Sequence, residues 1–258
     1  MPKTQFVSVI PCLDTRNGRL VKGVHFVKIK ELGDPAVAGK AYAEAGADEL
    51  VLLDITATLE GRNTLLDAVK RTVAGLGACP LTVGGGIGSL EDMQRLFDVG
   101  VARVSMNSAA VRRPGLIDEA AARFGSARIT VAIDTRNSAA VPSGFEVVVA
   151  GGTKGTGQDA VAWAREAQRR GAGSLLPTSM ETDGVRTGYD LPMTRAIADA
   201  VAVPVIASGG AGTLEHLAAA VREGHADAVL VASIAHFGTF TIRQMKDFLA
   251  AQGIPVRT

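Results

Sequence analysis

Two aspartates stand at equivalent places in the two halves of this chain. Asp14 ends the apolar run Ile-Pro-Cys-Leu-Asp, and Asp134, 120 residues later, ends Val-Ala-Ile-Asp. Because side chains alternate along a strand, Cys12 should point to the same side of its strand as Asp14, and Ala132 to the same side as Asp134. A single strand-end Asp usually caps a turn, whereas two carboxylates facing one ligand can divide general-acid and general-base roles. We therefore take this pair as the candidate catalytic groups.

Two glycine-rich segments repeat at nearly the same interval. Residues 83–91 read Val-Gly-Gly-Gly-Ile-Gly-Ser-Leu-Glu and residues 206–215 read Ile-Ala-Ser-Gly-Gly-Ala-Gly-Thr-Leu-Glu, which places Glu91 and Glu215 124 residues apart. Each segment predicts a short strand, a glycine turn and a helix start, with Thr213 as the N-cap of the second helix. Free backbone N–H groups at such a turn suit a phosphate. Two copies in a half-chain repeat predict a ligand with a phosphate at each end.

Other polar residues follow the same repeat. Asp54 and Thr178 end the second and sixth apolar runs, so they should lie on opposite walls of one site. Asp183 and Gly184 follow the sixth run and either offer backbone donors to the second phosphate or form an ordinary turn. Lys22, in a long loop, either reaches an anion or is merely solvated.

Short β-branched runs alternate with longer amphipathic ones along the whole chain. The pattern predicts eight strands, at residues 7–13, 49–54, 81–84, 102–106, 128–133, 174–178, 204–207 and 226–231. It predicts a helix after each strand, at residues 35–46, 63–76, 90–99, 115–124, 158–170, 192–200, 214–223 and 242–252. A single (β/α)8 TIM barrel spanning residues 1–258, with a two-fold half-barrel repeat, accounts for the count and the repeat; an open doubly wound sheet is the alternative.

Two connections are longer than a barrel requires. Residues 15–30 contain Asn17-Gly18 and alternating residues, which predict a small hairpin or a mobile flap. Residues 135–156 contain several glycines and Pro142 and are expected to form a long loop. Both would lie on the C-terminal face of a barrel, where active sites are built.

Charge and composition limit the classes of partner and the cellular compartment to be expected for this protein. A net charge of +1 argues against a nucleic-acid or membrane-surface partner. No apolar run reaches the roughly 18 residues of a membrane helix, and no signal-peptide pattern opens the chain, so a cytoplasmic protein is expected. Cys12 and Cys79 are expected to be small buried thiols. The four histidines lack metal-ligand spacing, so neither a metal nor a cofactor is expected.

Six motifs occur in order, at barrel spacing, over almost the whole chain. They are Ile-Pro-Cys-Leu-Asp-Thr-Arg-Asn-Gly-Arg-Leu-Val-Lys-Gly at residues 10–23, Leu-Asp-Ile-Thr-Ala at 53–57, Thr-Val-Gly-Gly-Gly-Ile at 82–87, Ala-Ile-Asp at 132–134, Asp-Gly and Gly-Tyr-Asp within 183–190, and Val-Ile-Ala-Ser-Gly-Gly-Ala-Gly at 205–212. Together they resemble the cyclase subunit of imidazole glycerol phosphate synthase, from histidine biosynthesis.

The resemblance implies a (β/α)8 enzyme acting on a bisphosphate, a ribulosyl-formimino aminoimidazole carboxamide ribonucleotide (PRFAR). Ammonia from a glutaminase partner would add to it, and cleavage and cyclisation would give imidazole glycerol phosphate and an aminoimidazole carboxamide ribotide. Carried over, Asp14 and Asp134 become the acid/base pair, and Lys22 belongs to a loop that closes over substrate. The phosphates would lie in a first cradle of Gly86, Asn107 and Ser108 and a second cradle of Asp183, Gly184, Gly210, Ala232 and Ser233. The remaining mouth residues would be Asp54, Thr178, Ser208 and Gly209.

The resemblance also implies a ring of four charged residues, an ammonia gate, at the N-terminal end of the barrel where the glutaminase binds. The matching positions are Ser8, Glu49, Arg103 and Ser174, so only a Glu49–Arg103 pair remains to form. After the sixth strand, Thr182 stands where the family has a basic residue. Pro177, within that strand, removes a backbone donor from the sheet.

Three functions remain open from sequence. The first is the ammonia-dependent cyclase. The second is a paralogue that keeps phosphate binding but acts on another phosphorylated substrate, including a sugar isomerase like the enzyme of the preceding step. The third is a non-enzymatic scaffold for a partner subunit, which the presence of both carboxylates disfavours.

Overall fold

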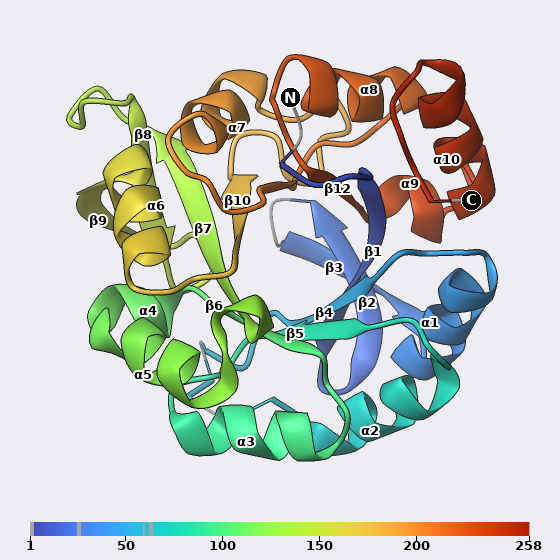
Figure 1. The fold of residues 1–258 in the computed structure, drawn as a ribbon. Helices are drawn as coiled ribbons and strands as arrows, with labels where there is room; N and C mark the ends of the chain where they lie inside the picture. The colour runs from blue at the N-terminus through green and yellow to red at the C-terminus, as the bar shows by residue number, and fades with distance from the viewer. Residues whose placement is uncertain (1–2, 25–26, 59, 62–63, 258) are drawn as a thin grey trace.

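The computed structural model describes residues 3–24, 27–58, 60–61 and 64–257, without the side chains of residues 22–30. Within these residues the chain alternates strands and helices, and the helices lie outside a central set of strands (Figure 1).

The central strands are parallel and follow one another around a ring. Their bounds are β1 (Ser8–Arg16), β4 (Leu50–Asp54), β5 (Leu81–Gly84), β6 (Arg103–Met106), β7 (Ile129–Asn137), β10 (Ser174–Ser179), β11 (Ile206–Ala207) and β12 (Ala228–Val231). From β1 to β10 each strand pairs with the next in this order, β11 pairs with β12, and β12 pairs with β1. Two isolated parallel bridges, Leu175–Val205 and Thr178–Ser208, join β10 to the β11 segment. The predicted TIM barrel is confirmed, with β1 and β7 on opposite sides of the ring.

The seam between β10 and β11 is sparsely bonded because of Pro177. The N–H of Leu175 donates to the carbonyl of Pro204 at 2.9 Å. Backbone groups alternate in direction along a strand, so residue 177 faces the same neighbour, where a proline has no N–H to donate. The expectation that Pro177 removes a ladder donor therefore explains why β11 is only two residues long.

Eight helices of eight or more residues surround the strands in the described part of the chain (Figure 1). They are α1 (Pro35–Glu44), α2 (Leu66–Gly75), α3 (Leu90–Asp98), α5 (Gly115–Phe124), α6 (Ala160–Arg169), α7 (Leu191–Ala198), α8 (Leu214–Arg222) and α10 (Ile242–Ala251). Thr213 is the N-cap of α8, as predicted. Two short helices, α4 (Ser108–Arg112) and α9 (Ser233–His236), follow β6 and β12, and a 3-10 turn, η1 (Ser126–Arg128), precedes β7.

Both long connections are antiparallel hairpins. β2 (Arg19–Val24) and β3 (Val27–Gly33) form the first, which confirms the hairpin predicted there. β8 (Phe145–Val149) and β9 (Lys154–Asp159) form the second with the extended end of β7. The expected loop at residues 135–156 is thus wrong in detail, because Phe-Glu-Val-Val-Val is a strand that pairs antiparallel with β7.

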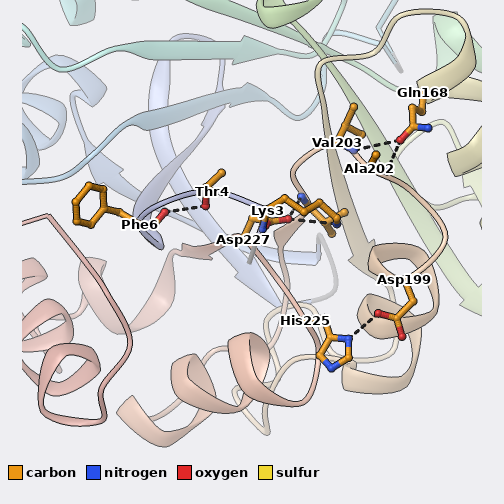
Figure 2. Close-up of polar contacts among 10 residues, drawn as sticks. Lys3, Thr4, Phe6, Gln168, Asp199, Ala202, Val203, His225 and Asp227 are labelled. Atoms are coloured by element: carbon orange, nitrogen blue, oxygen red, sulfur yellow. Dashed lines mark hydrogen bonds and ion pairs between the residues drawn. The ribbon is translucent and has the colours of Figure 1, made fainter. Parts of the chain in front are cut away.

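Side chains at the amino ends of the strands hold the base of the barrel together (Figure 2). The buried carboxylate of Asp227, just before β12, accepts from the Val205 N–H at 2.8 Å and from the backbone and ammonium groups of Lys3. The amide oxygen of Gln168 accepts from the Val203 N–H at 3.1 Å, and His225 contacts Asp199 at 2.6 Å. Asp227 and Gln168 thereby satisfy the N–H groups of Val205 and Val203, which precede the short β11.

The core has an outer layer, between strands and helices, and a small inner cluster. The inner cluster includes Ile10, Cys12, Val51, Leu176 and Leu230, which fill the barrel interior beneath its C-terminal mouth. Cys12 is buried, as expected, and Cys79 is only half-buried. Among the residues described, no helix has both the length and the apolar character to cross a membrane.

Candidate active site

A cavity of about 370 Å³ opens at the carboxyl ends of the barrel strands. Its volume lies in the range of small-molecule sites. It is lined by every predicted site residue at the mouth except Lys22, namely Asp14, Asp54, Gly86, Asn107, Ser108, Asp134, Thr178, Asp183, Gly184, Ser208, Gly209, Gly210, Ala232 and Ser233. Lys22 lies on β2, and its side chain is outside the described residues.

Asp134 is held by Asn107, the residue that follows the adjacent strand β6. The Asn107 amide donates to Asp134 Oδ2 at 2.9 Å and to the Val148 carbonyl at 3.3 Å. Burial raises the Asp134 pKa to about 7, the Asn107 hydrogen bond opposes this rise, and the nearby charge of Asp183 adds to it. A carboxyl group with this pKa exchanges protons readily at neutral pH, as general acid–base chemistry requires.

Asp14 lines the same cavity from the opposite strand. Its side chain is only 7% exposed, and the Cys12 thiol donates to its Oδ1 at 3.3 Å. Cys12 and Ala132 also line the cavity, so the predicted shared facings along β1 and β7 are confirmed. Two carboxylates from opposite walls therefore meet one space.

The two glycine turns approach neighbouring backbone too closely for any side chain. A Cβ on Gly85 would lie 2.2 Å from the Asp54 carbonyl oxygen, and a Cβ on Gly210 would lie 2.0 Å from that of Gly188. Both residues have positive φ, 91° and 103° respectively, a region that favours glycine. The repeat-related pairs Gly85–Gly86 and Gly209–Gly210 all have positive φ, so the repeat in sequence is a repeat of two tight turns that line the cavity.

Some buried polar atoms that line the cavity have no partner among the described residues. They include Asn107 Oδ1 and the hydroxyl of Ser105, which is 3% exposed. Ser108, by contrast, accepts from the Ala150 N–H at 3.0 Å, which ties the β8–β9 hairpin to the first cradle. Buried polar groups are normally paired, so Asn107 Oδ1 and Ser105 Oγ are suited to a polar ligand.

A partly buried chain of hydrogen bonds supports the strand that carries Asp14. His236 Nε2 contacts the Cys12 carbonyl at 2.8 Å, and the Tyr42 hydroxyl contacts His236 Nδ1 at 2.7 Å. A carbonyl only accepts, so His236 Nε2 donates to Cys12, and we assign the tautomer in which Nδ1 accepts from the Tyr42 hydroxyl. Burial raises the pKa of Tyr42 to about 12, which keeps its hydroxyl protonated and able to donate. Cys12 pairs with Val51 of β4 on one side, and on the other side, one residue beyond the last β1–β12 pair, the histidine takes the place of a strand partner.

Replacing Tyr42 with phenylalanine should lower the free energy of unfolding by about 1 kcal/mol, because it removes the hydrogen bond between the Tyr42 hydroxyl and His236 Nδ1. Urea unfolding of the variant at neutral pH measures this change. Equal stability of the variant and the parent would show that this hydrogen bond makes no net contribution to stability.

Sequence reasoning missed three charged residues that line the cavity, Asp92, Arg112 and Arg186. Asp92 accepts from the Gly88 N–H at 3.0 Å and so supports the first turn. Arg112 ends α4, and Arg186 follows Gly184 in the loop after β10. The only available signal was that both arginines lie within four residues of a predicted cradle residue.

The four proposed gate positions all lie at the amino ends of strands, opposite the cavity mouth. Arg103 pairs with Glu49 at 2.6 Å, which confirms that this ion pair forms. The Thr82 hydroxyl also donates to Glu49. Ser174 contacts the Thr130 hydroxyl at 2.8 Å, and Ser8 begins β1.

Comparison with known proteins agrees with this geometry. A family model described as histidine biosynthesis protein matches residues 8–241. The chain is 53% identical over 250 residues to the imidazole glycerol phosphate synthase subunit HisF of Trichormus variabilis, covering 96% of this chain and 97% of the relative. It is also 53% identical to the HisF subunit of Microcystis aeruginosa, covering 96% and 98% of the two chains. The match spans both glycine turns and both carboxylates, and this chain belongs to the histidine biosynthesis protein family.

Proposed function

We propose that this protein is the cyclase subunit of an imidazole glycerol phosphate synthase. The observation that carries the proposal is one cavity lined by both glycine turns and by Asp14 and Asp134. The two turns suit the two phosphates of PRFAR, and the carboxylates lie between them. The names of the 53% identical relatives support the same activity.

In this proposal the two carboxyl groups donate and accept protons while ammonia adds and the substrate is cleaved and cyclised. Asp134, with its pKa near 7, passes a proton to or from the reacting atoms at neutral pH. Asp14 acts from the opposite wall, and Asn107 fixes the orientation of Asp134 through its amide. The first and second cradles hold the ends of the substrate, so the bond to be cleaved lies between the carboxylates.

Turnover of PRFAR with ammonium salt tests the activity directly. Production of imidazole glycerol phosphate by the isolated chain, and growth of a histidine auxotroph that lacks the cyclase, are the expected results. A folded sample that neither turns over PRFAR nor restores growth would favour a paralogue with another phosphorylated substrate.

We further propose that a glutaminase subunit docks at the amino-end face and delivers ammonia through the barrel. The Glu49–Arg103 pair lies at that face, and the side chains of Ser8 and Ser174 carry no charge to close it further. The relatives' designation as subunits supports a partner.

Replacing Arg103 with methionine should reduce glutamine-dependent turnover, measured with a glutaminase subunit present. Turnover with external ammonium should change little, because the cavity mouth lies at the other end of the barrel. The ratio of the two rates is the measurement. An equal fall in both rates would indicate general damage and contradict a role at the ammonia entrance.

A further inference from the structure

Arg186 stacks on an exposed aromatic ring beside the second cradle. Its guanidinium carbon lies 4.8 Å from the centre of the Phe237 ring, within the range of a cation–π contact. Phe237 is 48% exposed, and its N–H donates to the Ser233 carbonyl at 3.0 Å, so the ring follows the second cradle by one helical turn. Arg186 itself lines the cavity.

The backbone of Arg186 is in an unfavourable conformation for an arginine. Its φ is +66°, in the left-handed region where glycine or asparagine is preferred. The loop is held in place, since the Gly188 N–H donates to the Gly210 carbonyl at 2.8 Å. A long charged side chain at a strained position beside a ligand cavity points to a role in binding.

The two ends of the cavity differ in which element supplies a positively charged side chain. The repeat that relates Ser108 to Ser233 also relates Arg112 to Phe237, so the first end has an arginine where the second has the ring. At the second end, Arg186 restores a cation from a different loop. Thr182, in that same loop, is uncharged, and no other Lys or Arg among the described residues lines this end of the cavity.

We propose that Arg186, positioned by Phe237, binds the phosphate held in the second cradle and thereby contributes to substrate affinity. This inference rests on the proposed function for the identity of the substrate. The planar guanidinium can donate two hydrogen bonds to one phosphate while its face remains on the ring. The cradle supplies backbone donors, and Arg186 supplies the charge.

The test replaces Arg186 with glycine, which removes the side chain and also relieves the backbone. We expect the KM for PRFAR at saturating ammonium to rise about tenfold with little change in kcat, because one charge-assisted contact to a non-reacting phosphate is lost. The Tm should stay equal to that of the parent protein or rise. Arg243→Ala, at an exposed position of α10 and away from the cavity, is the matched control and should leave KM unchanged.

Phe237→Leu examines the positioning role. It keeps an apolar side chain but removes the aromatic face, so KM should rise several-fold, and the double variant with Arg186→Gly should be no worse than Arg186→Gly alone. An unchanged KM in Arg186→Gly, with or without a lower Tm, would overturn the proposal and leave Arg186 as a surface contact of Phe237.

A second measurement separates this inference from the assigned reaction. Inorganic phosphate should raise the Tm of the parent protein by mass action, and this rise should be smaller in Arg186→Gly but intact in Arg243→Ala. If PRFAR is not turned over and the phosphate effect still depends on Arg186, the proposed reaction fails and the binding role stands. If PRFAR is turned over and neither KM nor the phosphate effect depends on Arg186, only the binding role fails.

Discussion

Asp134→Asn should reduce kcat with PRFAR and ammonium by about 10²- to 10⁴-fold, the usual contribution of a general acid or base. Asparagine keeps the volume and can still accept the Asn107 hydrogen bond, but it cannot exchange a proton. Substrate affinity should change little, because the phosphates bind at the two glycine turns rather than at Asp134. Steady-state kinetics at pH 7.5, with substrate binding measured separately, check both expectations.

Asp14→Asn should show a loss of the same order. Asp118→Asn is a suitable control, because Asp118 lies on α5, half-exposed and paired with Arg170, remote from the cavity. Turnover near the parent rate in either Asp14→Asn or Asp134→Asn would remove that carboxylate from the proposed mechanism. Loss of both substrate binding and turnover would instead assign that carboxylate to the binding site.

The fold was predictable because strand and helix periods alternate so regularly. The barrel strands and long helices lie within a few residues of their predicted bounds, and the glycine turns were placed by their repeat. The short α4 and α9 were not predicted, because five or fewer residues carry no period. The β8–β9 hairpin was missed because its second strand, Lys-Gly-Thr-Gly-Gln-Asp, has no β-branched alternation and pairs only in the tertiary context.

The site was predictable where strand ends and turns define it, and not where side chains reach in from elsewhere. Asp14 and Asp134 follow from the ends of apolar runs, whichever residues surround them. The hydrogen bond from Asn107 to Asp134 depends on β6 lying next to β7, which sequence implied only through the barrel. Arg186 depends on the path of a loop and on a ring that follows β12, for which the sequence carries no periodic signal.

Asp134→Asn should also stabilise the protein at pH 8, by about 2 to 4 kcal/mol in the free energy of unfolding. The pKa of Asp134 is about 7 in the folded chain, against 3.8 for an ordinary aspartate. Between about pH 4 and pH 7 the unfolded chain therefore releases a proton that the folded chain retains, so stability from this group falls as pH rises through that window. Above pH 7 the folded protein contains a charged carboxylate in a poorly solvated place, and its full cost persists.

Asparagine removes that cost, so the variant and the parent should differ most at pH 8 and progressively less toward pH 4. Urea unfolding of both proteins at pH 5 and pH 8 measures the difference, and other titrating groups cancel because they are common to both chains. A variant that is less stable than the parent at pH 8 would show that the carboxylate is well solvated or paired there, and its pKa would then be ordinary. Loss of turnover with a gain in stability from one substitution would show that the partial burial of Asp134 serves proton transfer rather than folding.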